Sequence, residues 1–292
     1  MKRRSLLAAV LVAGAMIVAG SVAGPALADK ANPEKIRVAL LPDENASTII
    51  QNAQPLKAHL EKALKKEIEI IVTTDYSSMI EAMRFGRIEV AYFGPFSYVL
   101  AKSKATEIEP FAVGVEKGKP YYNSVIIANA EGPVKSIEDI KGNPFAFGDQ
   151  ASTSSHLAPR TLLAKKGLIG DKDYKVVHLG KHDAVARAVA AGQVPAGALS
   201  EAIYRVLVKD GKIDPSKLKE IALSDPIPNY PMTLQGYLAP DLKEAIKKAF
   251  LELNDPEILK LFRVEKLAPA TDKDYDVLRD MATTLELDIA KL

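Results

Sequence analysis

Four hydroxyl residues stand in succession near the middle of the chain, from Ser152 to Ser155. They follow an apolar run that breaks at Gly148 and precede a helical pattern that begins at Leu157, so we expect a strand, a polar loop and a helix start. At a helix start, hydroxyls cap free N–H groups, while the remaining N–H groups and the helix dipole favour an anion. Four hydroxyls exceed what capping needs. The run therefore predicts an oxyanion site, with capping alone as the alternative.

One residue conflicts with a regular helix here. If the helix begins at Ser152 or Thr153, Pro159 lies beyond its first turn and lacks the N–H that would reach the carbonyl of Ser155. The sequence leaves two alternatives: the helix starts later, or its start is kinked around a free carbonyl.

Tyr76, Tyr122 and His182 also fall at predicted strand ends or helix starts. Ligand groups gather at the carboxyl ends of the strands of an α/β sheet, so these side chains are candidates for holding the same anion. Each has a structural alternative: a half-buried helix-start residue for Tyr76, hinge packing for Tyr122 and a helix cap for His182. For Glu201 the alternative is a favourable interaction with a helix N-terminus.

The sequence gives little support for catalysis or for a metal. Ser154 and Ser155 precede His156, but neighbours in sequence do not set the geometry of a triad, and the G-x-S-x-G elbow is absent. His178 and His182 straddle a strand end instead of sharing a helix, which argues against a zinc site. Neither standard nucleotide phosphate loop occurs. We expect no enzyme, no metal and no cofactor, and we interpret Ser155 and His156 as structural.

The composition is typical of an exported globular protein. The chain has 292 residues, 48% of them hydrophobic, which suffices for two lobes, and it has no cysteine. Lys2 to Arg4, an apolar run over 6–22 and the small residues Ala26 to Ala28 predict a signal peptide over 1–28, with an uncleaved anchor as the alternative. Its removal takes away three basic residues and lowers the net charge from +2 to −1. No basic surplus remains for nucleic acid, and a bacterial periplasm fits best.

Expected strands and helices alternate along the chain, which indicates parallel sheets covered by helices. The strands begin with 36–42, 68–72 and 88–92, and the clearest helix is 76–84. The tail beyond Leu234 holds more elements than a second lobe needs. The predicted organisation is therefore 29–128 plus 230–292 for lobe 1 and 129–229 for lobe 2.

Such an organisation requires the chain to cross between the lobes twice. We expect crossings near Ile127 and near Ser224 to Tyr230, where three prolines stiffen an extended segment. Two α/β lobes joined by two strands form a hinged clamp with the ligand in the cleft.

The motifs resemble the phosphonate and phosphite family of periplasmic solute-binding proteins, and most closely the phosphite-binding components of phosphite ABC importers. The resemblance runs from residue 36 to the end. The segments that carry it are Val38 to Ser47, Thr73 to Arg84, Ala91 to Pro95, Ala151 to Leu157 and Asp272 to Leu278.

The resemblance implies the type II periplasmic-binding-protein fold and no catalysis. We expect a monomer that delivers its ligand to the membrane permease of an ABC importer. In relatives that bind an aminoalkyl phosphonate, two tyrosines, a Ser-Thr-Ser run and a histidine hold the phosphonate. The matching positions here are Tyr76, Tyr122, Ser152, Thr153, Ser154 and His182. Of the two acids that bind the ammonium, one matches Glu201, whereas the other falls near Tyr230. Losing that carboxylate favours a smaller anion.

Phosphite is the ligand we predict. It presents three oxygens and one P–H, and an aromatic wall at the fourth vertex would leave the extra oxygen of phosphate without a partner. Tyr230, Tyr92 or Phe96 would supply that wall. A short alkyl phosphonate or phosphate is the alternative ligand, and a sensory receptor is the alternative to a transport role.

Overall fold

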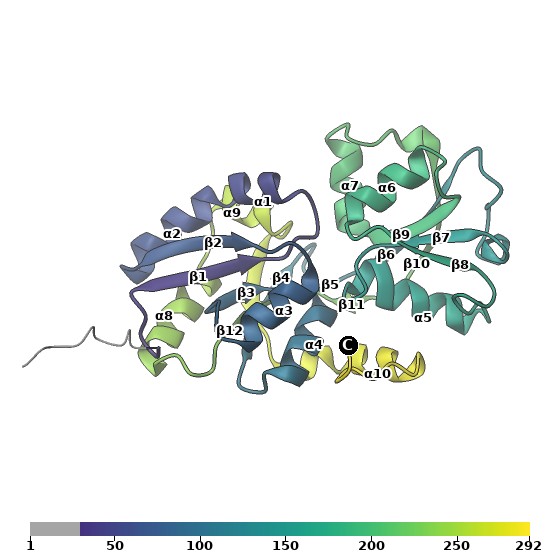
Figure 1. The fold of residues 1–292 in the computed structure, drawn as a ribbon. Coiled ribbons are helices and arrows are strands. Elements are labelled where there is room, and N and C mark those ends of the chain that lie inside the picture. The colour runs from purple at the N-terminus through teal and green to yellow at the C-terminus, as the bar shows by residue number, and fades with distance from the viewer. Residues whose placement is uncertain (1–29) are drawn as a thin grey trace, which may run out of the picture.

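The computed structural model describes residues 30–292. The signal peptide expected over 1–28 lies outside them. Among the helices of residues 30–292, none is both long and apolar enough to cross a membrane. Two mixed β-sheets, each covered by helices, form two lobes that lie side by side in Figure 1.

The first lobe is built on a six-stranded sheet with the order β13-β4-β12-β3-β1-β2. Its strands are β1 (Lys35–Leu40), β2 (Glu67–Val72), β3 (Val90–Tyr92), β4 (Glu109–Val115), β12 (Pro231–Leu234) and β13 (Lys266–Pro269). β1 runs parallel to β2 and β3, whereas β12 and β13 are antiparallel to their partners. The helices are α1 (Ala46–Asn52), α2 (Gln54–Leu64), α3 (Tyr76–Arg84), α4 (Pro95–Lys104), α8 (Pro240–Leu251) and α9 (Pro256–Leu261).

The second lobe is built on a five-stranded sheet with the order β10-β6-β9-β7-β8. Its strands are β6 (Ser124–Asn129), β7 (Pro144–Phe147), β8 (Lys175–His178), β9 (Ala196–Ser200) and β10 (Leu218–Leu223). β7 is parallel to β8 and β9, and β6 is antiparallel to β9 and β10. The helical segments are η1 (Glu138–Ile140), η2 (Thr153–Leu157), α5 (Ala158–Lys165), α6 (His182–Ala190), α7 (Glu201–Lys209) and η3 (Pro215–Lys217).

Two short strands join the lobes. β5 (Tyr121–Tyr122) pairs antiparallel with β11 (Ile227–Pro228). The second crossing thus lies where the prolines indicated, but the first was expected near Ile127 and the boundary after residue 128, and both are wrong. The pairing of Ser124 with Ser200 places all of β6 in the second sheet. An apolar strand next to a hinge has the same hydrophobic pattern whichever sheet it joins. The sequence therefore could not show that β6 belongs to the second sheet.

The tail returns to the first lobe, as expected, because β12 and β13 are strands of its sheet. The last elements are η4 (Asp272–Tyr275) and the C-terminal helix α10 (Asp276–Thr284). α10 packs against α4 of the first lobe and also against η2 and α5 of the second, so it contacts both lobes (Figure 1).

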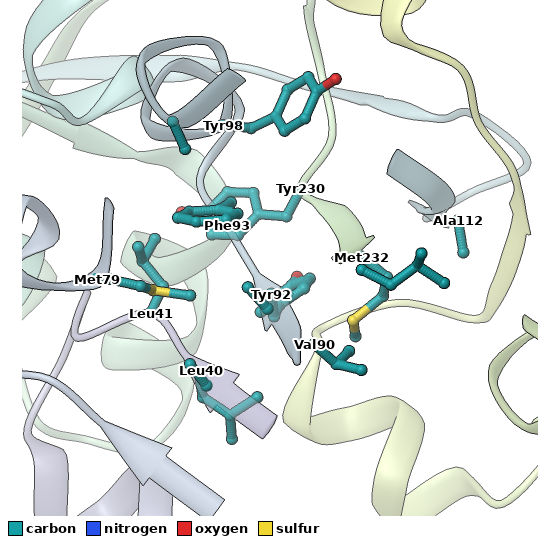
Figure 2. Packing of buried hydrophobic residues seen from close by; sticks show 14 of the residues in the cluster. Leu40, Leu41, Met79, Val90, Tyr92, Phe93, Tyr98, Ala112, Tyr230 and Met232 are labelled. Atoms are coloured by element: carbon teal, nitrogen blue, oxygen red, sulfur yellow. The ribbon is translucent and has the colours of Figure 1, made fainter. Parts of the chain in front are cut away.

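A buried cluster lies where the first sheet faces the hinge. Figure 2 shows Leu41, Met79 and Phe93 near Tyr92 and Tyr230, which belong to the same cluster. The segments that carry these aromatic rings, at the end of β3 and just before β12, are therefore anchored in the core of the first lobe. Close packing of this kind holds side chains in fixed positions.

Candidate anion-binding site

The hydroxyl run begins a helical segment with one wide turn. Ser152 is the N-cap, and its Oγ accepts the N–H of Ser155 at 3.2 Å. In η2, bonds span five residues: the N–H of Leu157 reaches the carbonyl of Ser152 at 3.1 Å, and that of Ala158 reaches Thr153. η2 is thus a π-helical turn, which inserts an extra residue before the regular helix α5.

This turn resolves the conflict with Pro159. The carbonyl of Ser155, which Pro159 cannot serve, accepts the N–H of Gly148 at 3.0 Å. A Cβ at Gly148 would lie 2.1 Å from the Oγ of Ser155, so the loop approaches the turn too closely for any other residue. The regular α-helix starts later, at Ala158, as the first alternative expected, but a π turn precedes it, and the carbonyl of Ser155 is not free.

Three hydroxyls of the run each receive one hydrogen bond. Ser152 accepts from Ser155, as above, Thr153 Oγ1 accepts the backbone N–H of Phe96 at 2.7 Å, and Ser154 Oγ accepts the phenol of Tyr122 at 3.2 Å. All three side chains are buried. Because a hydroxyl has one hydrogen to donate, each retains its O–H for a further acceptor.

His182 is the first residue of α6 and is fully buried. Its Nδ1 accepts the backbone N–H of Ser200 at 3.0 Å, which leaves the hydrogen of the neutral ring on Nε2. Burial lowers the pKa of His182 to about 4, against a smaller opposing effect of Asp43. Nε2 is buried without a hydrogen-bond partner. At neutral pH, His182 is therefore an uncharged donor with its N–H unused.

Tyr76 is the first residue of α3, which Asp75 caps by accepting the N–H of Ser78 at 2.7 Å. Its phenol oxygen is also buried without a partner, and burial raises the pKa of Tyr76 well above its ordinary value. A buried polar atom without a partner costs about 1–3 kcal/mol. Tyr76 and His182, two of the six predicted binding residues, carry such atoms, which is the pattern of a site built for a ligand.

A row of aromatic rings borders these donors. The ring of Tyr230 lies 5.2 Å from that of Tyr92 and 5.5 Å from that of Tyr122, and Phe262 lies 4.9 Å from Tyr92. All three residues expected as the wall, Tyr92, Phe96 and Tyr230, lie in one buried cluster, and the backbone N–H of Phe96 bonds Thr153. Tyr92 and Tyr230 remain candidates for the wall because the ring of Tyr230 packs beside those of both Tyr92 and Tyr122.

Glu201, a candidate for the ligand pocket, and His156, which we interpreted as structural, both have partners within the protein. The carboxylate of Glu201 pairs with Arg205 at 3.2 Å on α7. His156 donates from Nδ1 to the carbonyl of Gln150 at 2.7 Å, and its Nε2 accepts from Arg160 at 3.3 Å. Burial lowers the pKa of His156 to about 3. These contacts fix the loop that precedes the hydroxyl run.

The sequence interpretation missed Asp43 and Arg263. Arg263 binds Asp43 Oδ2 at 2.7 Å and Glu44 at 2.9 Å. The carbonyl of Asp43 accepts the backbone N–H of His182 at 3.2 Å, which joins the lobes. Asp43 follows β1 directly, so its place at a strand end was a usable signal. Arg263 stands in a turn between α9 and β13, where nothing local marks it.

An open cavity of about 570 Å³ adjoins these residues between the lobes. Asp43, Tyr92 and Arg263 line it from the first lobe, and Val206, Asp210 and Lys212 from the second. No cluster of His, Cys, Asp and Glu suited to a metal occurs within residues 30–292. The arrangement can hold an oxyanion with uncharged donors drawn from both lobes and the hinge.

Two α/β lobes joined by paired strands around such a site define the type II periplasmic-binding-protein fold. Residues 38–275 match the family described as "ABC transporter, phosphonate, periplasmic substrate-binding protein". The chain belongs to this family, whose members bind substrates for ABC transporters and are not enzymes.

Individual relatives agree on the class. The chain is 29% identical to the phosphate-import protein PhnD of Mycolicibacterium smegmatis, over 85% of this chain and 84% of that protein. It is 24% identical to a probable ABC transporter phosphite binding protein of Prochlorococcus marinus, over 87% and 91%. The solved structure of PhnD1 from Prochlorococcus marinus with methylphosphonate has a TM-score of 0.80, 23% identity and coverage of 87% and 99%. At that identity the structure supports the fold alone.

Proposed function

We propose that this protein captures phosphite in the periplasm and delivers it to the membrane permease of an ABC importer. The observation that carries the proposal is the pair of buried, unused donors on Tyr76 and His182, beside three hydroxyls that each retain a hydrogen. Uncharged hydrogen-bond donors match an oxyanion. Donors from both lobes stabilise the closed state, which is the signal a permease reads.

The aromatic row favours phosphite over phosphate. Phosphite places a P–H where phosphate places an oxygen, and the paired rings of Tyr92 and Tyr230, whose centroids lie 5.2 Å apart, would form the wall at that vertex. An oxygen held against these rings without a partner costs about 1–3 kcal/mol, which weakens binding about 5-fold to over 100-fold. The row also disfavours methylphosphonate, because a methyl group needs room that a close ring does not leave.

Short alkyl phosphonates and phosphate are the alternative ligands. The relatives support them, since one at 29% identity is named for phosphate import and a structural neighbour holds methylphosphonate. Aminoalkyl phosphonates are less favoured, because Glu201 pairs with Arg205 and a tyrosine stands at position 230.

Calorimetric titration of the exported protein tests the ligand. We expect binding in the order phosphite, methylphosphonate, phosphate, aminoethylphosphonate. Equal affinities for phosphite and phosphate would overturn the discrimination, and no binding of any of the four would overturn the function. Ser154→Ala removes a hydroxyl of the run, whereas Ser103→Ala, which removes an exposed hydroxyl that donates to the carbonyl of Leu100 on α4, is the control. We expect weaker binding from the first and unchanged binding from the second.

Location, transport and assembly need separate tests. N-terminal sequencing of the exported protein should find that residues 1–28 are absent, and an intact N-terminus would indicate an anchor. Deletion of the gene should abolish growth on the ligand as sole phosphorus source, whereas loss of a signalling response alone would indicate a sensory receptor. Light scattering should give the mass of a monomer.

A further inference from the structure

The donors of the site leave one ligand group without a partner. Tyr76, His182 and the three hydroxyls all present hydrogens. Ionised oxygens of an anion accept from such groups. A protonated oxygen has a hydrogen of its own and needs an acceptor.

Asp43 is placed to be that acceptor. It is 3% exposed, its carbonyl accepts the N–H of His182 at 3.2 Å, and it lines the cavity between the lobes together with Tyr92 and Arg263. Arg263 fixes Oδ2 at 2.7 Å. Within residues 30–292, Arg263 is the one group that bonds this carboxylate, so Oδ1 remains available.

The charge balance sharpens the role of Asp43. Arg263 is shared between two carboxylates, Asp43 and Glu44, at 2.7 and 2.9 Å. One cation therefore faces two acids, and this group of three charges has no surplus positive charge for an anion. A carboxylate beside an ionised oxygen repels it, whereas beside a protonated oxygen it accepts a strong hydrogen bond.

We propose that Asp43 accepts a hydrogen bond from a protonated oxygen of the bound anion, so that the site takes oxyanions that keep one proton and rejects fully ionised ones. Phosphite and phosphonates gain or lose their last ionisable proton near neutral pH, and phosphate keeps at least one proton there, whereas sulfate and sulfonates keep none. This inference rests on the proposed function, and it extends that function by excluding sulfur oxyanions.

Other groups that titrate face Asp43 from the elements around it. They are Glu44 after β1, Tyr76 on α3, Tyr92 on β3, Tyr122 on β5, His182 on α6, Tyr230 after β11 and Arg263 before β13, while Asp183 on α6 acts on Glu44 and His182. His182, with its pKa lowered to about 4 by burial, stays neutral above pH 5.5, and burial raises the pKa of each tyrosine. Burial also raises the pKa of Glu44, so Glu44→Gln is the necessary control.

Titration with phosphite between pH 5.5 and 8.5, and with sulfate and methanesulfonate at pH 7, tests the inference. In the wild type we expect phosphite affinity to fall with rising pH, approaching about tenfold per pH unit once the ligand has lost its second proton. Sulfate and methanesulfonate should bind at least about 100-fold more weakly than phosphite. Glu44→Gln should keep this pH profile.

Asp43→Asn separates recognition from a structural role, because its amide still reaches Arg263 through the oxygen and donates to an ionised oxygen. We expect a flat pH profile and a gap between phosphite and sulfate narrowed by at least about tenfold. Equal weakening for every anion with an unchanged profile would assign Asp43 a structural role and overturn the inference. If this variant does not fold, a wild-type affinity for phosphite that is constant or rises with pH overturns it equally. Absence of binding to any phosphorus oxyanion would instead reject the proposed function.

Discussion

The two lobes contribute to the site in different ways. In the second lobe the donors are oriented by their own surroundings: Ser200 holds His182, and Ser155 donates to Ser152. In the first lobe, the phenol of Tyr76 has no partner, and the N–H of Phe96 bonds across the cleft to Thr153. The second lobe is thus a preorganised cradle, and the first lobe completes the site when the lobes meet.

This contrast indicates an order of events. A group whose orientation depends only on its own lobe keeps that orientation when the lobes separate. Contacts such as Phe96 to Thr153, or His182 to the carbonyl of Asp43, exist only in the closed state. We therefore expect the anion to bind the second lobe first and to draw the first lobe onto it.

Lowering the pH should reduce the free energy of unfolding, through protonation of His182, by more than any single substitution proposed below. The pKa of His182 is lowered from 6.5 to about 4 by burial, so the unfolded chain binds the proton first as pH falls. Stability contributed by neutral His182 is complete above pH 6.5 and is lost on the way to pH 4, by about 3 kcal/mol. Urea unfolding at stepped pH values measures this. His156 acts with the same sign, so the difference between wild type and His182→Ala isolates His182.

His182→Ala should give the largest loss of affinity. It removes a hydrogen bond to a charged ligand, worth about 1.5–3 kcal/mol, and leaves the N–H of Ser200 without its partner. We expect phosphite to bind about 10- to 150-fold more weakly by calorimetry. His59→Gln, on α2 and bonded to Ala249, is the control and should bind normally. Unchanged affinity in His182→Ala would remove His182 from the site.

Tyr76→Phe should also lower the affinity for the anion, but it should not lower the stability of the ligand-free protein. The variant loses one donor to the ligand, which costs about 1.5 kcal/mol or slightly more, or roughly tenfold in affinity. The ligand-free protein loses an unpaired buried oxygen, so its melting temperature should hold or rise. A lower melting temperature would show that the phenol has a structural partner, and would break the contrast between the lobes.

Thr153→Val tests the bond between the lobes. The variant leaves the N–H of Phe96 unpaired only in the closed state, and about 1–2 kcal/mol of closure should be lost. The variant also removes the O–H of Thr153 from the cradle, whereas His182 and the other two hydroxyls remain, so we expect faster dissociation with a smaller change in association, measured by stopped flow. Thr153→Ser retains the hydroxyl and should behave as wild type; if both variants dissociate equally fast, the methyl group and not the bond is responsible.

Glu201→Gln should have the smallest effect. Its carboxylate pairs with Arg205 on a partly exposed helix face, and such pairs contribute about 0.3–0.5 kcal/mol. We expect unchanged phosphite affinity and a melting temperature within a degree or two of wild type. A clear loss of affinity would return Glu201 to the site.

Local signals in the sequence were sufficient to predict the positions of helices and strands near the candidate site. The helix expected over 76–84 is α3, because its cap and its apolar spacing depend on neighbours in the chain. The strands leading into the candidate site were also found, and the strand-end rule selected Tyr122, whose phenol bonds Ser154 of the hydroxyl run. The family and the fold class expected from the motifs are confirmed.

Features set by distant partners were not accessible. The π turn depends on Gly148 closing onto Ser155, and the link from Asp43 to His182 depends on how two lobes meet. The side chain of Arg263 bonds Asp43, which lies 220 positions earlier in the sequence. Hydrophobic spacing carries no information on such pairings, which is also why β6 was assigned to the wrong lobe.

The paired strands β5 and β11 have a mechanical consequence. Tyr122 lies on the pivot itself, so rotation of the lobes moves it little, while the far rim of the cleft sweeps the widest arc. Asn52 and Asp210 line that rim from opposite lobes, and the chain has no cysteine of its own. Two fluorescent dyes attached to cysteines introduced at these positions would change their separation when the lobes close. Binding of a small ligand would therefore give a large change in energy transfer between the dyes.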